Sequence, residues 1–174
     1  MQDLKPGVLV VEEPSGVIDP QLGSREFGET PLGQVCGLRL DGMRTRYFME
    51  DAVLGGQAFK VEIVYDGERM ERVDLCVKMP GDKKGWDGWT EEGERRRKGL
   101  GEAWIAKAFG ATADAKPITM EDGVEVVPFE NAWDSPRRVL FHGGEVVSYY
   151  DSKAGFAGVV VRYGEMGADQ RGGH

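Results

Sequence analysis

The residue types in this sequence that could do chemistry are an internal histidine and two cysteines. His142, in the segment Phe-His-Gly-Gly, is the candidate general base near neutral pH, because the other histidine, His174, is terminal. A turn histidine bonded to the backbone is the simpler interpretation, and the spacing specifies no serine or acid partner. Cys36, Cys76 and His142 lack the local spacing of zinc ligands. We therefore predict no metal site, and we interpret the cysteines as buried free thiols in strands.

Acidic pairs and closely spaced glycines are the other patterns that a catalytic or cofactor site could use. Adjacent carboxylates occur at Glu12-Glu13, Glu91-Glu92 and Glu121-Asp122. General acid–base catalysis needs carboxylates in an apolar pocket, whereas such pairs usually mark a solvated face or a helix N-terminus. The segment Gly99-Leu100-Gly101 has neither the third glycine nor the preceding strand of a dinucleotide-binding loop. We assign no catalytic and no cofactor-binding residue from the sequence.

One long helix is predicted over residues 86–110, in the segment WDGWTEEGERRRKGLGEAWIAKAFG. Thr90 is a good N-cap, and the acidic residues that follow it lie where the helix dipole favours negative charge. The basic run 95–98 spreads around the helix circumference and can pair with glutamates four residues earlier. We therefore predict a solvated, self-paired face and no nucleic-acid patch. An apolar stripe for packing on a sheet is formed by Leu100, Trp104, Ile105 and Ala108.

Strands and turns are predicted on both sides of this helix. Alternating apolar and polar residues around the turn pairs Asp41-Gly42 and Asp66-Gly67 indicate hairpins, with strands at 34–40, 44–49, 59–65, 70–79, 145–150 and 156–163. The predicted fold class is α+β: an antiparallel sheet of two or more hairpins with one main helix packed on a face. Residues 32–164 are predicted to form this single domain. Residues 1–31 are predicted to be a weakly ordered arm with an edge strand at 8–11, and residues 165–174 a flexible tail.

Composition and charge narrow the class of function. The chain has 174 residues, enough for one domain with a core, and a net charge of −8. Non-specific nucleic-acid binding needs a basic footprint, which this acidic chain lacks. An acidic surface suits solubility or a basic protein partner. With two cysteines, no visible secretory signal and no apolar run of membrane-spanning length, the sequence favours the reducing cytoplasm.

The order of segments resembles a group of small bacterial proteins, some of them similar to the immunity proteins that accompany polymorphic or contact-delivered toxins. A hairpin leads into a Trp-Asp-x-Trp-Thr-Glu-Glu helix start, then a basic helix with a tryptophan and a final Glu-Val-x-Ser-x-Tyr-Asp-x-Lys hairpin. The residues that carry the resemblance, within 32–164, are Trp86, Asp87, Trp89, Thr90, Glu91, Glu92, Trp104, Glu145, Val146, Ser148, Tyr150, Asp151, Lys153 and Val159 to Tyr163. The extra helix glycines and the 111–141 insert depart from the pattern.

The resemblance implies a non-enzymatic function, in which the protein binds one cognate toxin with a basic cleft and blocks its active site, without a cofactor. The shared motif does not include the binding residues. The acidic and aromatic residues that we expect to contact the toxin are Glu91, Glu92, Glu121, Asp122, Asp134, Trp86 and Trp89. Two alternatives stay open: a small enzyme with a site near His142 and the turn at 151–153, and a structural or adaptor module of a secretion system. The sequence specifies no oligomeric state.

Overall fold

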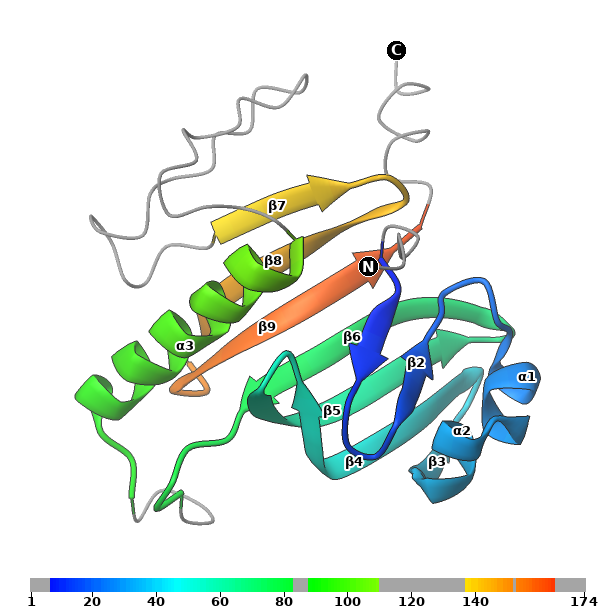
Figure 1. Cartoon of the computed structure of the whole chain (residues 1–174), viewed down its shortest axis with the longest axis horizontal. Coiled ribbons are helices and arrows are strands. Elements are labelled where there is room, and N and C mark those ends of the chain that lie inside the picture. Colours follow the sequence, from blue (N-terminus) through cyan, green and yellow to red (C-terminus); the bar gives the residue numbers. More distant parts are fainter. Residues whose placement is uncertain (1–6, 83–87, 110–136, 152, 165–174) are drawn as a thin grey trace.

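The computed structural model describes residues 7–82, 88–109, 137–151 and 153–164 (Figure 1). Within these ranges the main element is a seven-stranded antiparallel sheet in the spatial order β3-β4-β5-β6-β9-β8-β7. Its strands are β3 (Gly37–Asp41), β4 (Arg44–Leu54), β5 (Gln57–Asp66), β6 (Arg69–Val77), β7 (Arg137–Phe141), β8 (Gly144–Asp151) and β9 (Phe156–Tyr163). The other described elements are β1 (Leu9–Val11), β2 (Gly16–Ile18), α1 (Ser24–Glu29), α2 (Pro31–Val35) and the main helix α3 (Glu91–Phe109). The predicted α+β class is confirmed in this general form.

Tight glycine turns build the sheet from hairpins. The predicted turns at Asp41-Gly42 and Asp66-Gly67 join β3 to β4 and β5 to β6, and their glycines have φ angles of 61° and 60°. A third hairpin, between β4 and β5, turns at Gly55-Gly56, where φ is 56° and 77°. A type I′ turn requires positive φ at both central residues, which glycine adopts without strain. The sequence prediction ended this strand at residue 49 and did not include the third turn.

One row of apolar side chains crosses the seven-stranded sheet on a single face. In the order of the strands, and in cross-strand register, it consists of Leu38, Tyr47, Ile63, Val73, Val161, Val146 and Val139. All of these side chains except Leu38 are buried. Burying one valine or isoleucine stabilises the fold by about 1.5–3 kcal/mol, so this row joins the hairpins into one core.

The two groups of elements that cover this face are α3 and the N-terminal segment (Figure 1). α3 packs on β6, β8 and β9, and the β1–β2 hairpin packs on β4. In α1, Phe27 lies edge-on to Tyr47 with ring centroids 4.9 Å apart, and the Tyr47 hydroxyl donates to the Ser24 carbonyl. Residues 7–31, predicted to be a weakly ordered arm, instead belong to the core. Prolines and glycines divide this segment into pieces that are too short to show the repeat of apolar residues typical of a strand or helix. Which of its side chains are buried therefore depends on the sheet beneath it. The predicted tail 165–174 lies outside the described residues.

α3 lies within its predicted bounds and has the predicted cap. The Gly93 amide donates to Thr90 Oγ1 at 2.9 Å, so Thr90 is the N-cap. Trp104 and Ile105 of the predicted apolar stripe are buried, whereas Ala108 is exposed. The buried part of the stripe is therefore narrower than the helical spacing indicated.

The basic run of α3 is only partly a solvated face. Arg95 is exposed and pairs with Glu91 at 2.8 Å, as predicted. Lys98 is instead buried and pairs with Glu102 at 2.6 Å, and Glu102 also accepts a hydrogen bond from Ser148 of β8 at 2.8 Å. Sequence spacing predicted that Lys98 would pair with a glutamate on the N-terminal side. The error arises because the side of the helix that faces the sheet carries charges as well as apolar residues.

Candidate binding surface

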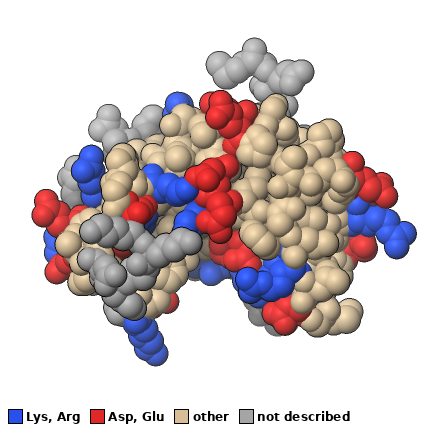
Figure 2. Space-filling view, turned by 90° about the horizontal axis from the view of Figure 1, so that it is seen from below, with Lys and Arg blue, Asp and Glu red and all other residues tan. Residues whose placement is uncertain are grey.

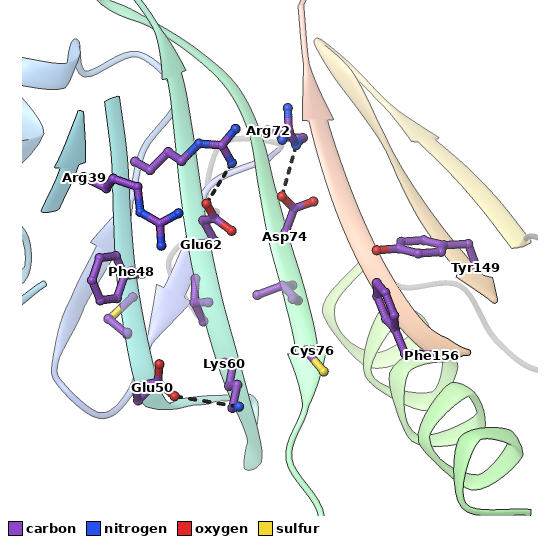
Figure 3. Close-up of a pocket in the computed structure, with 15 residues that line it drawn as sticks. Arg39, Phe48, Glu50, Lys60, Glu62, Arg72, Asp74, Cys76, Tyr149 and Phe156 are labelled. Carbon is purple, nitrogen blue, oxygen red and sulfur yellow. Dashed lines mark hydrogen bonds and ion pairs between the residues drawn. The ribbon is translucent and has the colours of Figure 1, made fainter. Parts of the chain in front are cut away.

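The two central strands of the sheet, β6 and β9, separate along part of their length. They pair only over Arg72–Leu75 and Val159–Arg162, and beyond Leu75 they diverge (Figure 3). Each is the last strand of its own run of hairpins, β3 to β6 and β7 to β9, so no turn joins them. Peptide groups at this opening need other partners, because an unpaired buried N–H or C=O costs about 1–3 kcal/mol.

Two charged side chains of α3 supply those partners from the covered face. Glu94, which is 7% exposed, accepts a hydrogen bond from the Ala157 amide of β9 at 2.9 Å. The Arg97 guanidinium donates to the Val77 carbonyl of β6 and forms ion pairs with Glu94 at 3.3 Å and Asp82 at 2.8 Å. The hydrogen bond from Arg97 holds the pKa of Asp82 below its usual value. Arg97, in the run predicted to be solvated, therefore connects α3 to the opening.

The opposite, open face of the sheet has a groove of about 570 Å³ near this opening (Figure 3). Aromatic side chains form its two sides: Phe48 of β4 on one, and Tyr149 of β8 with Phe156 of β9 on the other. Charged side chains lie between them, and ion pairs join Arg46 to Glu62 at 2.8 Å, Arg72 to Asp74 at 3.0 Å and Lys60 to Glu50 at 3.8 Å. Arg39, at the β3 edge of the groove, has no carboxylate partner among the described residues. Most of the charge in the groove is therefore already paired.

Glycines on neighbouring strands make room for two of the aromatic rings. The Phe48 ring lies over Gly37 of β3, and a Cβ atom there would collide with it. The Tyr149 ring lies over Gly158 of β9, where an added Cβ would come within 2.7 Å of the phenol oxygen. Tyr149 and Phe156 meet edge to face, with centroids 6.2 Å apart. The shape of the groove thus depends on small residues opposite large ones.

Burial raises the pKa values of three groups in the groove, Cys76, Tyr149 and Asp74. It raises the pKa of the Cys76 thiol, and it raises the pKa of Tyr149 to about 12, an effect to which the nearby Asp74 charge adds. Burial also raises the pKa of Asp74 itself, against the opposing effect of Arg72. A catalytic thiol is activated in the other direction, by a lowered pKa. These groups are therefore suited to hydrogen bonding with a bound molecule.

An exposed pair of aromatic residues lies where the groove approaches the N-terminal end of α3. The Trp89 indole N–H donates to the carbonyl of Gly155 in the β8–β9 turn, and Phe156 follows directly in the chain. Trp89 is 40% exposed and Phe156 is 39% exposed. Glu91 and Glu92, the first residues of α3, are also exposed. We call Trp89, Phe156, Glu91 and Glu92 the aromatic–acidic surface.

Acidic side chains also form a band on the exterior. Figure 2, which views the molecule from below, shows Asp and Glu in a band across the molecule, bordered by Lys and Arg and lying beside a broad area of other residue types. This band and the net charge of −8 favour the approach of a positively charged partner.

The structure describes three of the seven residues predicted to contact a partner. Trp89, Glu91 and Glu92 are exposed and belong to the aromatic–acidic surface. The other four lie outside the described residues: Trp86, Glu121, Asp122 and Asp134. Phe156 was not among the predicted residues, because its proximity to Trp89 depends on the docking of α3 beside the β8–β9 turn.

His142 does not lie near the turn with which it was expected to form an enzyme site. It is exposed in the β7–β8 turn and lines a second hollow, of about 490 Å³, together with Arg69 and Tyr163. Asp151 is at the other end of β8, a strand that spans about 23 Å at roughly 3.3 Å per residue. The structure therefore brings His142 and the 151–153 turn to opposite ends of one strand, and they cannot form a single site.

The sequence contains a signal for part of the groove. The alternation of β4, β5 and β6 places Arg46, Glu62 and Asp74 on the face opposite the core, which the period of the strands indicates. Tyr149 and Phe156 join them only through the pairing of β9 with β6. No local pattern specifies that pairing.

No family model, curated protein or solved structure matches this chain. In the described ranges, no helix is long and apolar enough to cross a membrane, and no group of three or more histidine, cysteine, aspartate or glutamate side chains could hold a metal ion. The function is therefore inferred from the geometry of the aromatic–acidic surface and the groove.

Proposed function

We propose that this protein binds a cognate protein toxin with a basic cleft and neutralises it, in the manner of the immunity proteins that its sequence resembles. The observation that carries the proposal is the aromatic–acidic surface. Trp89 and Phe156 come from separate parts of the chain: Trp89 donates to the carbonyl of Gly155 in the β8–β9 turn, Phe156 is the next residue, and each residue is about two-fifths exposed. A partner that covers this turn can contact both side chains.

Aromatic anchors of this kind supply much of the free energy at protein interfaces. A tryptophan at the centre of an interface commonly contributes 2 kcal/mol or more, on the order of a 30-fold change in affinity. The hydrogen bond from Trp89 to Gly155 holds the indole before a partner binds. Less side-chain entropy is then lost on association.

The glutamates beside Trp89 add charge complementarity. Glu91 pairs with Arg95 at 2.8 Å, but both side chains are more than half exposed, and such pairs are worth only about 0.2–1 kcal/mol. A lysine or arginine of the partner can replace Arg95 at little cost. Exposed acids of this kind chiefly accelerate association with a basic surface and select against acidic ones.

The groove supports a binding function as well. Phe156 belongs both to the aromatic–acidic surface and to the wall of the groove, so a segment docked on the first can extend into the second. The thiol of Cys76 and the phenol of Tyr149 are protonated at neutral pH, and burial raises both pKa values further. They can therefore donate hydrogen bonds to that segment.

The test begins with the product of the open reading frame next to the gene for this protein. Co-expression is expected to restore growth to cells poisoned by that product, and the purified proteins are expected to form a complex measurable by calorimetry. The double variant W89A/F156A is expected to raise the Kd at least about 100-fold. V17A, which alters a side chain of similar exposure (42%) on β2, serves as the control and is expected to bind like the wild type.

Two outcomes would count against the proposal. If the neighbouring product is neither neutralised nor bound, the immunity function is rejected. If it is bound but W89A/F156A, shown by circular dichroism to be folded, binds as tightly as V17A, the aromatic–acidic surface is not the contact. The variant E91K/E92K separates the charge effect, because it should slow association more than it speeds dissociation.

A further inference from the structure

Among the residues that the structure describes, no strand pairs with the outer side of β3, which forms an edge of the seven-stranded sheet and exposes apolar side chains. Leu38 is 56% exposed, Leu40 73%, and Met43 in the following turn 77%. An edge strand also presents unpaired N–H and C=O groups, which are a template for pairing with another strand. The residues that flank a two-residue hairpin loop form a hydrogen-bonded pair, so counting back from the loop at 42–43 places the outward groups on Leu38 and Leu40.

We propose that two copies of this chain associate through antiparallel pairing of their β3 strands, which joins the two sheets into one. In this arrangement Leu40 lies opposite Leu40 of the second copy. Arg39 of each copy lies opposite Asp41 of the second copy. The inference does not rest on the proposed function: β4, β5 and β6 separate β3 from the aromatic–acidic surface, and Arg39 alone of the paired residues also lines the groove.

Three antiparallel registers bring the outward peptide groups of Leu38 and Leu40 together: Leu38 opposite Leu40, Leu38 opposite Leu38, and Leu40 opposite Leu40. The charges of Arg39 and Asp41 favour the last of them. Pairing Leu38 with Leu40 would place Arg39 opposite itself, and like charges directly opposite one another destabilise a sheet. Pairing Leu38 with itself would place Arg39 opposite Gly37, with no charge contact. Pairing Leu40 with itself forms two Arg39–Asp41 contacts, at non-hydrogen-bonded positions where the side chains come closest.

Both charges are available for this contact within each chain. Arg39 has no carboxylate partner among the residues that the structure describes. The Asp41 carboxylate is 68% exposed, and its nearest cation, Arg46 Nε, is 3.9 Å away. Neither side chain must leave a strong ion pair to reach the second copy.

The size of the edge sets the strength of the association. β3 has five residues, and in this register only residues 39–41 of each copy face one another, so the contact buries much less than the roughly 1,200 Å² typical of stable complexes. We therefore expect a weak, concentration-dependent dimer, with a Kd on the order of 10 µM to 1 mM.

Sedimentation velocity on the full chain, from about 10 µM to about 1 mM, tests the inference. R39D and D41R are each expected to weaken the dimer at least about 5-fold, because each places like charges opposite one another. The double variant R39D/D41R exchanges the charges and is expected to restore the wild-type Kd. R25D makes the same charge change at an exposed position of α1 and is the matched control.

A second variant tests the apolar contact without disturbing the strand. L40T introduces a β-branched residue that suits a strand and removes most of the apolar contact, so it is expected to weaken the dimer while the thermal unfolding midpoint of the diluted protein changes little. A chain that stays monomeric up to the highest concentration would overturn the proposal. So would a dimer that R39D leaves intact, or one that R39D/D41R fails to restore.

Discussion

Replacing Glu94 with alanine tests whether α3 closes the opening between β6 and β9. The substitution leaves the buried Ala157 amide without its acceptor, which costs about 1–3 kcal/mol. It also removes the ion pair with Arg97, but Arg97 keeps Asp82 and the Val77 carbonyl, so this adds about 1 kcal/mol. We expect E94A to lower the free energy of unfolding by about 2–4 kcal/mol in total. E94Q retains an oxygen acceptor and is expected to lower it by about 1 kcal/mol.

Urea unfolding followed by far-ultraviolet circular dichroism measures this difference. With an m value of about 2 kcal/mol per molar urea, E94A should lower the unfolding midpoint by roughly 1–2 M. The control is E91A, which removes another glutamate of α3. The ion pair of Glu91 with Arg95, at 2.8 Å, is exposed to solvent. Such a pair contributes at most about 1 kcal/mol. If E94A and E91A shift the midpoint equally, Glu94 does not close the opening.

Two further predictions use the same unfolding measurement. K98M should lower the free energy of unfolding by about 3–5 kcal/mol, because it leaves the buried Glu102 without the cation 2.6 Å away. The double variant K98M/E102L should recover most of that loss, and a double variant as unstable as K98M would contradict the buried-pair interpretation. Burial raises the pKa of Asp74 in the folded state. Above that pKa the ionised carboxylate destabilises the folded state. This penalty vanishes below the pKa of Asp in the unfolded chain, about 3.9, where the group is protonated in both states. D74N should therefore unfold at higher urea than the wild type at neutral pH and at the same urea near pH 3, and equal midpoints at neutral pH would refute the sign of this effect.

Local signals account for the parts of the fold that the sequence predicted correctly. The turns at Asp41-Gly42 and Asp66-Gly67 are read from residue pairs that favour positive φ at glycine. The alternation of β5 and β6, and the Thr90 cap of α3, each depend on residues a few positions apart. Such interactions form within one element or one hairpin, so no knowledge of the rest of the chain is needed to predict them.

The N-terminal segment and the charged side of α3 could not be predicted in this way. β1, β2 and α1 are too short to show a period, and their apolar residues are recognised only against the sheet that they cover. Glu94 and Lys98 have the composition of a solvated helix face, yet both are buried. Glu94 is needed there because the β6–β9 opening leaves the Ala157 amide without a strand partner.

The candidate binding surface shows the same division. From the sequence alone came the helix start at Thr90, the exposed acids Glu91 and Glu92, and a tryptophan beside them. Only the tertiary structure placed Trp89 against the β8–β9 turn and Phe156 at the edge of a groove. The physical reason is that β6 and β9, far apart in the chain, pair because their apolar residues continue one buried row. That gain depends on the whole sheet, and no short stretch of sequence carries a signal for it.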